Sequence, residues 1–228
     1  MIKRLIAAID TPELDRAAGL VRALSPHCGL VKLGLEFFLR HGPAGFAQAA
    51  QGNAVFLDLK LHDIPNTVAG AVRSLLPLGA DMLTIHAGGG AKMVAAAALA
   101  ADKAEKRPKI LAVTVLTSMD AAGLAEIGVA GGPPQQVLRL ARMALANGAD
   151  GLVCSAHEIA LLRDAFGAKP ILVVPGIRPA GAALGDQARV MTPEQAVRAG
   201  ADYIVVGRPI TEAASPAQAA AAIAASIQ

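Results

Sequence analysis

The sequence has almost no large aromatic side chains. Trp is absent, Tyr occurs once, and aromatic residues make up 3% of the 228 positions. Proteins that bind single-stranded nucleic acid stack its bases on aromatic rings, and this chain has little to offer such a partner. The formal net charge of +3 is mild and is not gathered in a Lys/Arg run. We therefore expect no nucleic-acid partner, and the slight basicity suits a small anionic ligand better.

Cysteine and long apolar runs are also scarce. Cys28 and Cys154 lie far apart without a CxxC pair or a Cys/His cluster, which argues against a disulfide framework or a structural zinc. No uninterrupted apolar stretch approaches the roughly 20 residues of a membrane span. The apolar run Leu5–Ile9 ends at Asp10, well short of a signal-peptide core. We therefore expect a soluble cytoplasmic protein with no membrane partner.

Apolar residues are abundant, at 54% of the chain, which is enough to bury a full core. Short runs rich in Val, Ile and Leu alternate with helix-like stretches, and no linker interrupts the alternation. The predicted parallel strands are Leu5–Asp10, Leu30–Gly34, Val55–Lys60, Met82–Ala87, Ile110–Leu116, Gly151–Ser155, Ile171–Gly176 and Tyr203–Gly207. The clearest helix-like stretches are Thr11–Leu24, Thr67–Leu78, Ala91–Ala101, Pro134–Ala146, His157–Ala165, Thr192–Ala199 and a closing helix within Ala213–Ile227.

A Gly-Ala-Asp triplet recurs just before three of the predicted strands, at Gly79–Asp81, Gly148–Asp150 and Gly200–Asp202, and its glycine is suited to ending a helix. Eight strand–helix units in about 230 residues is the size of a compact TIM barrel. We therefore predict an α/β fold, a single-domain (β/α)8 TIM barrel over residues 1–228. A doubly wound open sheet is the alternative, but no GxGxxG follows the first predicted strand.

Polar side chains gather where the predicted strands end, which is where a TIM barrel keeps its chemistry. They are Asp10, Lys32, Asp58 with Lys60, His86, Thr117 with Ser118, Ser155, Arg178 and Arg208. The last two follow strands seven and eight, where such barrels often bind phosphate through backbone N–H groups at a glycine turn. Arg208 beside Gly207 adds a planar guanidinium that suits a phosphate dianion.

The segment Phe56–Asp63 is the most informative of these strand ends. Asp58 and Lys60 are two apart in a strand, so their side chains are predicted to share a face while the intervening leucines face the other way. A buried ion pair is weak evidence for stability, because desolvation costs about what the attraction returns. We therefore interpret Asp58, Lys60 and the following Asp63 as parts of a reaction site.

The run Asp58–Thr67, which reads DLKLHDIPNT, resembles the signature of the orotidine 5′-monophosphate decarboxylases. Further segments resemble that family in order, namely Ala8–Asp10, Val31–Gly34, Thr114–Met119, Pro175–Pro179 with Gly185–Arg189, and Val206–Ile210. A lone DxKxxD would be shared with metal-dependent barrels, but these segments together are specific and span nearly the whole chain. The resemblance implies decarboxylation of orotidine 5′-monophosphate to UMP and CO2, the last step of de novo UMP synthesis, without metal or organic cofactor.

The resemblance also implies catalytic roles. Lys60 would deliver a proton to C6 of the pyrimidine as CO2 leaves. The surrounding array of alternating charge would consist of Lys32, Asp58, Lys60 and Asp63. Asp63 would reach into the neighbouring subunit's site across a homodimer, and Ile64 and Thr67 would also cross that interface.

Substrate binding would extend along the whole nucleotide. By the same resemblance, Asp10 and Lys32 would hold the ribose hydroxyls, and Thr117 or Ser118 would contact the base. The phosphate would be held by Arg178, Gln187, Gly207 and Arg208.

Several of these residues have structural alternatives. Asp10 and Asp63 could cap the segments that follow them, and Lys32 could be a snorkelling surface lysine. Asp58 and Lys60 could form a purely structural ion pair. A lone His86 at a strand end is more often part of a hydrogen-bonded structure than a base or ligand.

Two other functions remain as alternatives. One is a related barrel that uses Mg²⁺ on a sugar phosphate, as a decarboxylase or epimerase, which needs hard oxygen ligands at neighbouring strand ends. Lys32 argues against it, because an ammonium beside Asp58 would repel a divalent cation. The other is a catalytically silent barrel that binds a nucleotide as a sensor, which an intact Lys60 disfavours.

Overall fold

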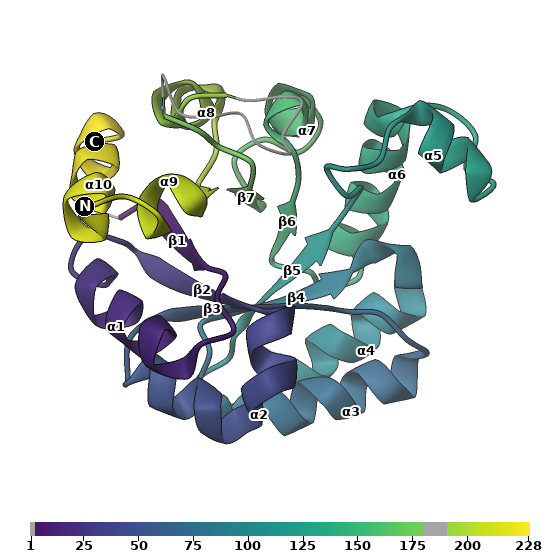
Figure 1. Ribbon diagram of the computed structural model, residues 1–228. Coiled ribbons are helices and arrows are strands. Elements are labelled where there is room, and N and C mark those ends of the chain that lie inside the picture. The colour runs from purple at the N-terminus through teal and green to yellow at the C-terminus, as the bar shows by residue number, and fades with distance from the viewer. Residues whose placement is uncertain (1–2, 180–190) are drawn as a thin grey trace.

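Eight parallel strands close into a barrel in which each strand pairs with its sequence neighbours and β8 returns to β1 (Figure 1). The computed structural model describes residues 3–179 and 191–228. The strands are β1 Leu5–Ile9, β2 Leu30–Gly34, β3 Val55–Leu61, β4 Met82–His86, β5 Lys109–Val113, β6 Gly151–Val153, β7 Ile171–Val174 and β8 Tyr203–Val206. The predicted (β/α)8 barrel is therefore confirmed, and the doubly wound alternative is wrong.

Helices surround the barrel (Figure 1). They are α1 Leu14–Leu24, α2 Leu35–Ala50, α3 Pro65–Leu75, α4 Ala91–Ala101, α5 Ala121–Glu126, α6 Pro133–Ala146, α7 Ile159–Phe166, α8 Pro193–Ala199, α9 Arg208–Thr211 and α10 Pro216–Ser226. Short 3-10 turns occupy Leu76–Leu78, Ala87–Gly89 and Ala156–Glu158. None of the helices in these described ranges is long and apolar enough to cross a bilayer.

The helices form because apolar residues recur at helical spacing. In α3, Pro65 occupies the first turn and Val68, Val72 and Leu75 are buried against the barrel, a spacing of four and three residues. In α2 the pattern is broken at Gly42, whose φ of 59° and ψ of −162° kink the helix before Pro43. That kink is why the sequence pattern did not single out α2.

The apolar core has two parts. The larger part lies between the strands and the surrounding helices, and a smaller cluster fills the barrel interior. The interior cluster consists of Ile6, Ala8, Leu30, Phe56, Met82, Leu111, Val173 and Val205. Lys32, Asp58 and Thr84 are two residues further along their strands than Leu30, Phe56 and Met82, so the interior turns from apolar to polar toward the strand C-termini. The apolar cluster forms the floor under these polar side chains.

The three Gly-Ala-Asp triplets tie strands together at the opposite end of the barrel. Each aspartate accepts a backbone N–H at the start of the preceding strand, from Val55 to Asp81 at 2.9 Å, from Ile110 to Asp150 at 2.8 Å and from Leu172 to Asp202 at 2.8 Å. Each also pairs with a cation, namely Lys106, Arg107 and Arg163 respectively. The aspartate of each triplet therefore accepts a backbone N–H that the strand ladder leaves without an acceptor at the N-terminal end of the barrel.

Candidate active site

Four charged side chains of alternating sign lie in a row at the C-terminal ends of β1, β2 and β3. Lys32 Nζ lies 3.1 Å from Asp10 Oδ1 and 3.6 Å from Asp58 Oδ2. Lys60 Nζ lies 2.9 Å from both carboxylate oxygens of Asp58. Lys32 and Asp58, in the middle of the row, are only 11% and 12% exposed, whereas Asp10 is 63% and Lys60 40% exposed. The row therefore has a buried centre and two ends that a ligand can reach.

Strand pairing brings these residues together. In the ladder, Lys32 is the partner of Ala8, two residues before Asp10, and Asp58 is the partner of Gly34, two residues after Lys32. Lys32 therefore points toward the site and is buried, so it is not a snorkelling surface lysine. Asp10 bonds the Lys32 ammonium, and α1 begins only at Leu14, so Asp10 is not the cap of that helix.

Lys60 reaches Asp58 through an irregularity in β3. Between Leu57 and Leu61, β3 advances four residues while the facing strand β4 advances two. Lys60 has a φ of 51°, in the left-handed region, which costs a residue with a Cβ about 1–2 kcal/mol. The predicted contact between Asp58 and Lys60 is confirmed, but a bulge brings it about instead of the flat alternation of an ideal strand.

Asp58 is the anion at the centre of the row. Burial by itself would raise the pKa of Asp58, but the charges of Lys32 and Lys60 and hydrogen bonds from Lys60 and Thr84 outweigh burial and hold this pKa below its ordinary value. The carboxylate is thus ionised at neutral pH and forms ion pairs with both ammonium groups. Such a row can place a cation, and a carboxylate that resists protonation, against the same part of a ligand.

His86, at the end of β4, has a structural role. Its Nδ1 accepts the Gly88 N–H at 3.1 Å, which places the proton of the neutral ring on Nε2. The ring stacks on His62, with centroids 5.0 Å apart and planes 9° apart. Burial, His62 and Lys60 all lower the pKa of His86, which keeps the ring neutral at neutral pH. In this tautomer Nε2–H is a donor and the Nδ1 lone pair is used by the Gly88 N–H.

The predicted phosphate residues follow β7 and β8. Gly207 is the N-cap of α9 and lies beside the charged row, since a Cβ at this position would be 3.8 Å from Asp10 Oδ2. Arg208 is the exposed first residue of α9. Arg178 follows β7 and its backbone N–H bonds the Met191 carbonyl at 3.2 Å. Gln187 lies outside the described residues.

Thr117 and Ser118 lie in the loop after β5, which ends earlier than predicted, at Val113. Both line a cavity of about 220 Å³, together with Val115, Leu116, Met119, Asp120, Pro133, Ser155, Ala156, Glu158 and Pro175. Both residues are exposed, so their solvent exposure does not favour either one as the base contact.

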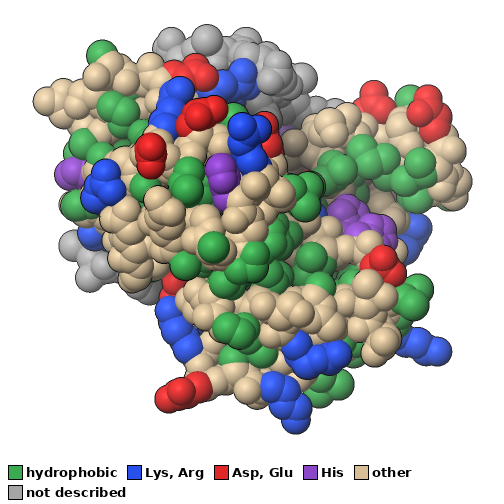
Figure 2. Space-filling model, turned by 60° about the horizontal axis from the view of Figure 1, so that its bottom comes forward, with side chains coloured by type: hydrophobic (Ala, Val, Ile, Leu, Met, Phe, Trp, Pro, Cys, Tyr) green, Lys and Arg blue, Asp and Glu red, His purple; other side chains and the backbone are tan. Residues whose placement is uncertain are grey.

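Asp63, Ile64 and Thr67 lie together at the start of α3 and face away from the protein. Asp63 is exposed and its carboxylate accepts the N–H of the next residue, Ile64, at 2.6 Å. Ile64 is 66% exposed, which is unusual for a large apolar side chain. Thr67 is exposed in the first turn of α3. Figure 2 brings the lower side of Figure 1 forward and shows apolar side chains among charged ones there.

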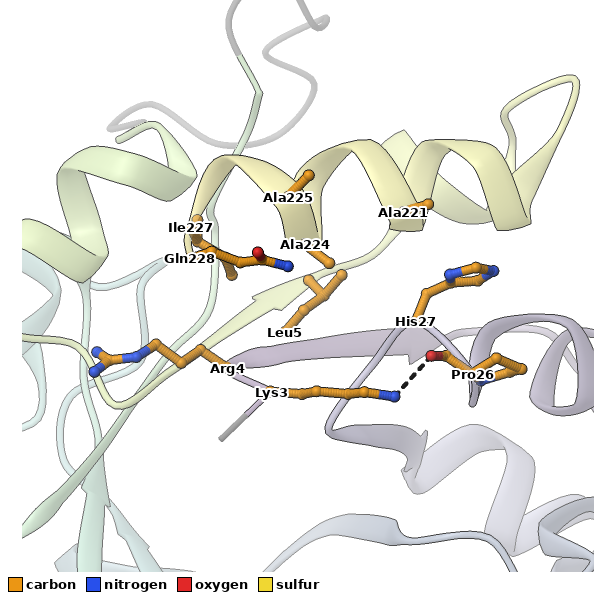
Figure 3. Close-up of a pocket in the computed structure, with 10 residues that line it drawn as sticks. All are labelled: Lys3, Arg4, Leu5, Pro26, His27, Ala221, Ala224, Ala225, Ile227 and Gln228. Atoms are coloured by element: carbon orange, nitrogen blue, oxygen red, sulfur yellow. Dashed lines mark hydrogen bonds between the residues drawn. The ribbon is translucent and has the colours of Figure 1, made fainter. Parts of the chain in front are cut away.

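A larger hollow lies at the other end of the barrel and is separate from the charged row. Figure 3 shows it between α10 and the start of β1, and its volume is about 440 Å³. The two cations that line it are already bonded to the backbone, Lys3 to the Pro26 carbonyl at 2.7 Å and Arg4 to the Ala201 carbonyl at 3.1 Å. This hollow carries none of the predicted site residues.

Thr84 is a polar residue at the site that is not among the residues predicted from the sequence. Its side chain is fully buried in β4 and bonds both Asp58 and Lys60. A signal for it was present, because Thr84 is two residues before His86 and therefore shares its face of the strand. Over residues 3–179 and 191–228, no group of three His, Cys, Asp or Glu side chains is placed to hold a metal ion.

A closed (β/α)8 barrel with charged side chains converging at the C-terminal ends of its strands defines the TIM-barrel enzymes. A sequence profile of the Orotidine 5′-phosphate decarboxylase / HUMPS family matches residues 3–223, and the chain belongs to this family. The resemblance of its motifs is thereby confirmed.

Relatives of known name support this assignment. The chain is 58% identical to the orotidine 5′-phosphate decarboxylase of Anaeromyxobacter sp. (strain K), over 99% of this chain and 98% of that one. It is 56% identical to the enzyme of the same name from Gluconobacter oxydans, over 96% and 95% of the two chains. The crystal structure of orotidine 5′-phosphate decarboxylase from Lactobacillus acidophilus superposes with a TM-score of 0.88 at 37% identity, covering 99% of both chains.

Proposed function

We propose that this protein decarboxylates orotidine 5′-monophosphate to UMP and CO2 in pyrimidine biosynthesis, and that it does so without a metal or an organic cofactor. The observation that carries the proposal is the ammonium of Lys60, which is held on both oxygens of Asp58 at the rim of the barrel. The 58% identity to a protein named for this activity supports the choice of substrate.

The reaction explains why such an ammonium is needed. The bond between C6 and the carboxylate breaks, CO2 departs, and the electron pair stays on C6, where the pyrimidine offers no electron sink. A fixed cation beside C6 stabilises that charge, and the same group can supply the proton that replaces CO2. Lys60 can do both, since its side chain is 40% exposed and its position is set by Asp58.

Asp58 contributes in two ways. It holds Lys60 in place, and its negative charge would repel the substrate carboxylate in the ground state, a repulsion that vanishes as CO2 leaves. Lys32 beside it keeps Asp58 ionised while sharing its own charge with Asp10. In the bound complex, Asp10 and Lys32 would hold the ribose hydroxyls.

The phosphate would bind where the loops after β7 and β8 meet. Arg178 and Arg208 follow these strands, and Gly207 lies between β8 and α9, beside Asp10. With Gln187, these residues would hold the dianion, while Thr117 or Ser118 would contact the base. Binding energy from this distant group can then be used to assemble the site around the base.

A magnesium-dependent reaction on a sugar phosphate is disfavoured by the contacts of Asp58. Lys60 Nζ lies 2.9 Å from both Asp58 oxygens, Lys32 Nζ lies 3.6 Å from one, and Thr84 bonds the other. A divalent cation at this carboxylate would have to displace two ammonium groups. We therefore keep the cofactor-free reaction as the proposal.

We further propose that the active form is a cytoplasmic homodimer in which Asp63, Ile64 and Thr67 reach across to the partner's site. The exposure of the apolar Ile64 beside Asp63 supports this arrangement. It would add a third carboxylate to the row, next to Lys60, and cover an exposed isoleucine.

The first test is loss of the orotate ultraviolet absorbance when purified protein is added to orotidine 5′-monophosphate with excess EDTA. The control is Lys60→Ala, which removes the ammonium together with the methylene stem that carries it. We expect turnover by the wild type and none above background by the variant. Activity that EDTA abolishes would favour the magnesium reaction, and tight nucleotide binding without turnover would favour a silent barrel.

A further inference from the structure

The backbone N–H of Lys60 is not bonded to the neighbouring strand in the usual way. Because β3 advances four residues against two of β4 at this point, the regular ladder is interrupted. The Lys60 N–H instead donates to the side-chain oxygen of Thr84 at 2.8 Å. Without that acceptor, a partly buried donor would lose its partner at a residue whose φ of 51° is already unfavourable.

The Thr84 hydroxyl has a fixed orientation. A backbone N–H can only donate and a carboxylate can only accept, so Thr84 Oγ1 accepts from Lys60 and donates to Asp58 Oδ1 at 2.9 Å. Thr84 is fully buried on β4, so solvent does not reach its hydroxyl. One hydroxyl thus holds both the backbone that carries the ammonium and the carboxylate that the ammonium contacts.

We infer that Thr84 is a positioning residue for the reaction, acting through Lys60 and Asp58 without touching the substrate. This inference rests on the proposed function for its kinetic readout. Removing the hydroxyl would relax the bulge and remove the hydrogen bond that joins Asp58 to β4, so the Asp58–Lys60 pair would shift and the ammonium would no longer be aimed at the reacting carbon. Misplacement of a reacting group by about 1 Å can cost a rate factor on the order of 100.

The test compares Thr84→Val, which keeps the shape and loses both bonds, with Thr84→Ser, which keeps the hydroxyl. We expect kcat to fall about 10- to 100-fold in Thr84→Val with little change in KM, and Thr84→Ser to retain most of the wild-type kcat. Wild-type kcat in Thr84→Val, or equal losses in both variants, would overturn the inference.

Thr114→Val is the matched control for stability. Thr114 is also a buried threonine, 1% exposed, and its hydroxyl donates to the Val153 carbonyl at 3.1 Å, away from Asp58 and Lys60. The Thr114→Val variant should be less stable than the wild type but keep the wild-type kcat. If Thr84→Val does not fold, Thr84→Ala makes the same test, because alanine also lacks the hydroxyl but places no methyl group against the carboxylate.

A crystal structure of the Thr84 variant separates failure of this inference from failure of the proposed function. If wild-type protein does not decarboxylate the nucleotide, the function is wrong, but the structure still decides the role of Thr84. We expect the Lys60 φ to leave the left-handed region and its ammonium to move off Asp58. An unchanged Lys60 in that variant would overturn the inference.

Discussion

Asp58 lies between two cations inside the barrel, and this position links its ionisation to the stability of the fold. Burial by itself would raise its pKa, but the charges of Lys32 and Lys60, with hydrogen bonds from Lys60 and Thr84, hold the pKa below its ordinary value of 3.8. A carboxyl group with a lowered pKa stabilises the folded state above its unfolded pKa, and this contribution is lost as the pH falls through the folded pKa.

Replacement of Asp58 by asparagine should therefore lower the free energy of unfolding at pH 7, by about 1–3 kcal/mol, because two ammonium groups lose their shared anion. The difference from wild type should persist from pH 7 down to about pH 4 and shrink below it, as the wild-type carboxylate takes up a proton. Urea unfolding of both proteins between pH 7.5 and 3 measures this difference.

The exposed Asp164 supplies the control for that series, since Asp164→Asn removes a surface carboxylate and should change stability little. A difference for Asp58→Asn that stays constant down to pH 3 would contradict a stabilising, ionised Asp58.

At the scale of elements, the two ends of the barrel have different roles, one in the reaction and one in stability. The C-terminal ends carry the charged row and the bulge of β3, whereas the N-terminal ends carry the Gly-Ala-Asp triplets. In the last triplet, Asp202 joins Leu172 in β7 to Arg163 in α7, and Arg163 also donates to the carbonyls of Gly200 and Pro170. Strand β8, helix α7 and strand β7 are thereby joined at one carboxylate.

Asp202→Ala should destabilise the protein by about 1–3 kcal/mol, because the Leu172 N–H and the Arg163 guanidinium both lose an acceptor. Asp202→Asn keeps a neutral oxygen acceptor and should lose less. Since this end of the barrel is remote from the charged row, kcat of both variants should stay at the wild-type value. Thermal unfolding with parallel kinetics tests this, and a fall in kcat with unchanged stability would contradict the structural role.

At the scale of the whole molecule, the proposed homodimer would bring Asp63 of each chain to the site of its partner. Asp63 lies at the surface, bonded to the next N–H, and Ile64 is 66% exposed beside it. On α2, Leu35 and Leu39 are 50% and 75% exposed. Large apolar side chains exposed near functional residues are typical of an interface, and a two-fold dimer would give each site an Asp63 from its partner.

Mixing two inactive variants tests that arrangement. Asp63→Ala and Lys60→Ala homodimers each lack one group in both sites, but a mixed dimer has one site with both groups. Equal mixing with free subunit exchange should restore about a quarter of wild-type activity, because half of the dimers are mixed and each has one intact site. No recovery, with exchange verified by mass, would mean that Asp63 acts within its own subunit or that the chain is monomeric.

Much of the fold and of the charged row could be predicted from the sequence. Short apolar runs separated by helical stretches predict eight parallel strands. An apolar pattern with strand spacing forms a continuous buried face only in a strand, and one with helical spacing only in a helix. The positions of Asp10, Lys32, Asp58 and Lys60 at strand ends followed from that alternation, and the structure brings these four together. Helix α2 was not predicted, because Gly42 and Pro43 interrupt the helical spacing of its apolar residues.

Only the tertiary structure decided how these residues contact one another. The bulge of β3, the left-handed Lys60 and the hydroxyl of Thr84 depend on the register between two strands that are joined by a helix, and register is not visible in either strand alone. The Gly-Ala-Asp aspartates likewise bond a strand 26 to 40 positions earlier in the chain. Local periodicity determines helices and strands because it depends on neighbours in the chain. The orientation and the ionisation of the site side chains depend on neighbours in space, which only the closed barrel supplies.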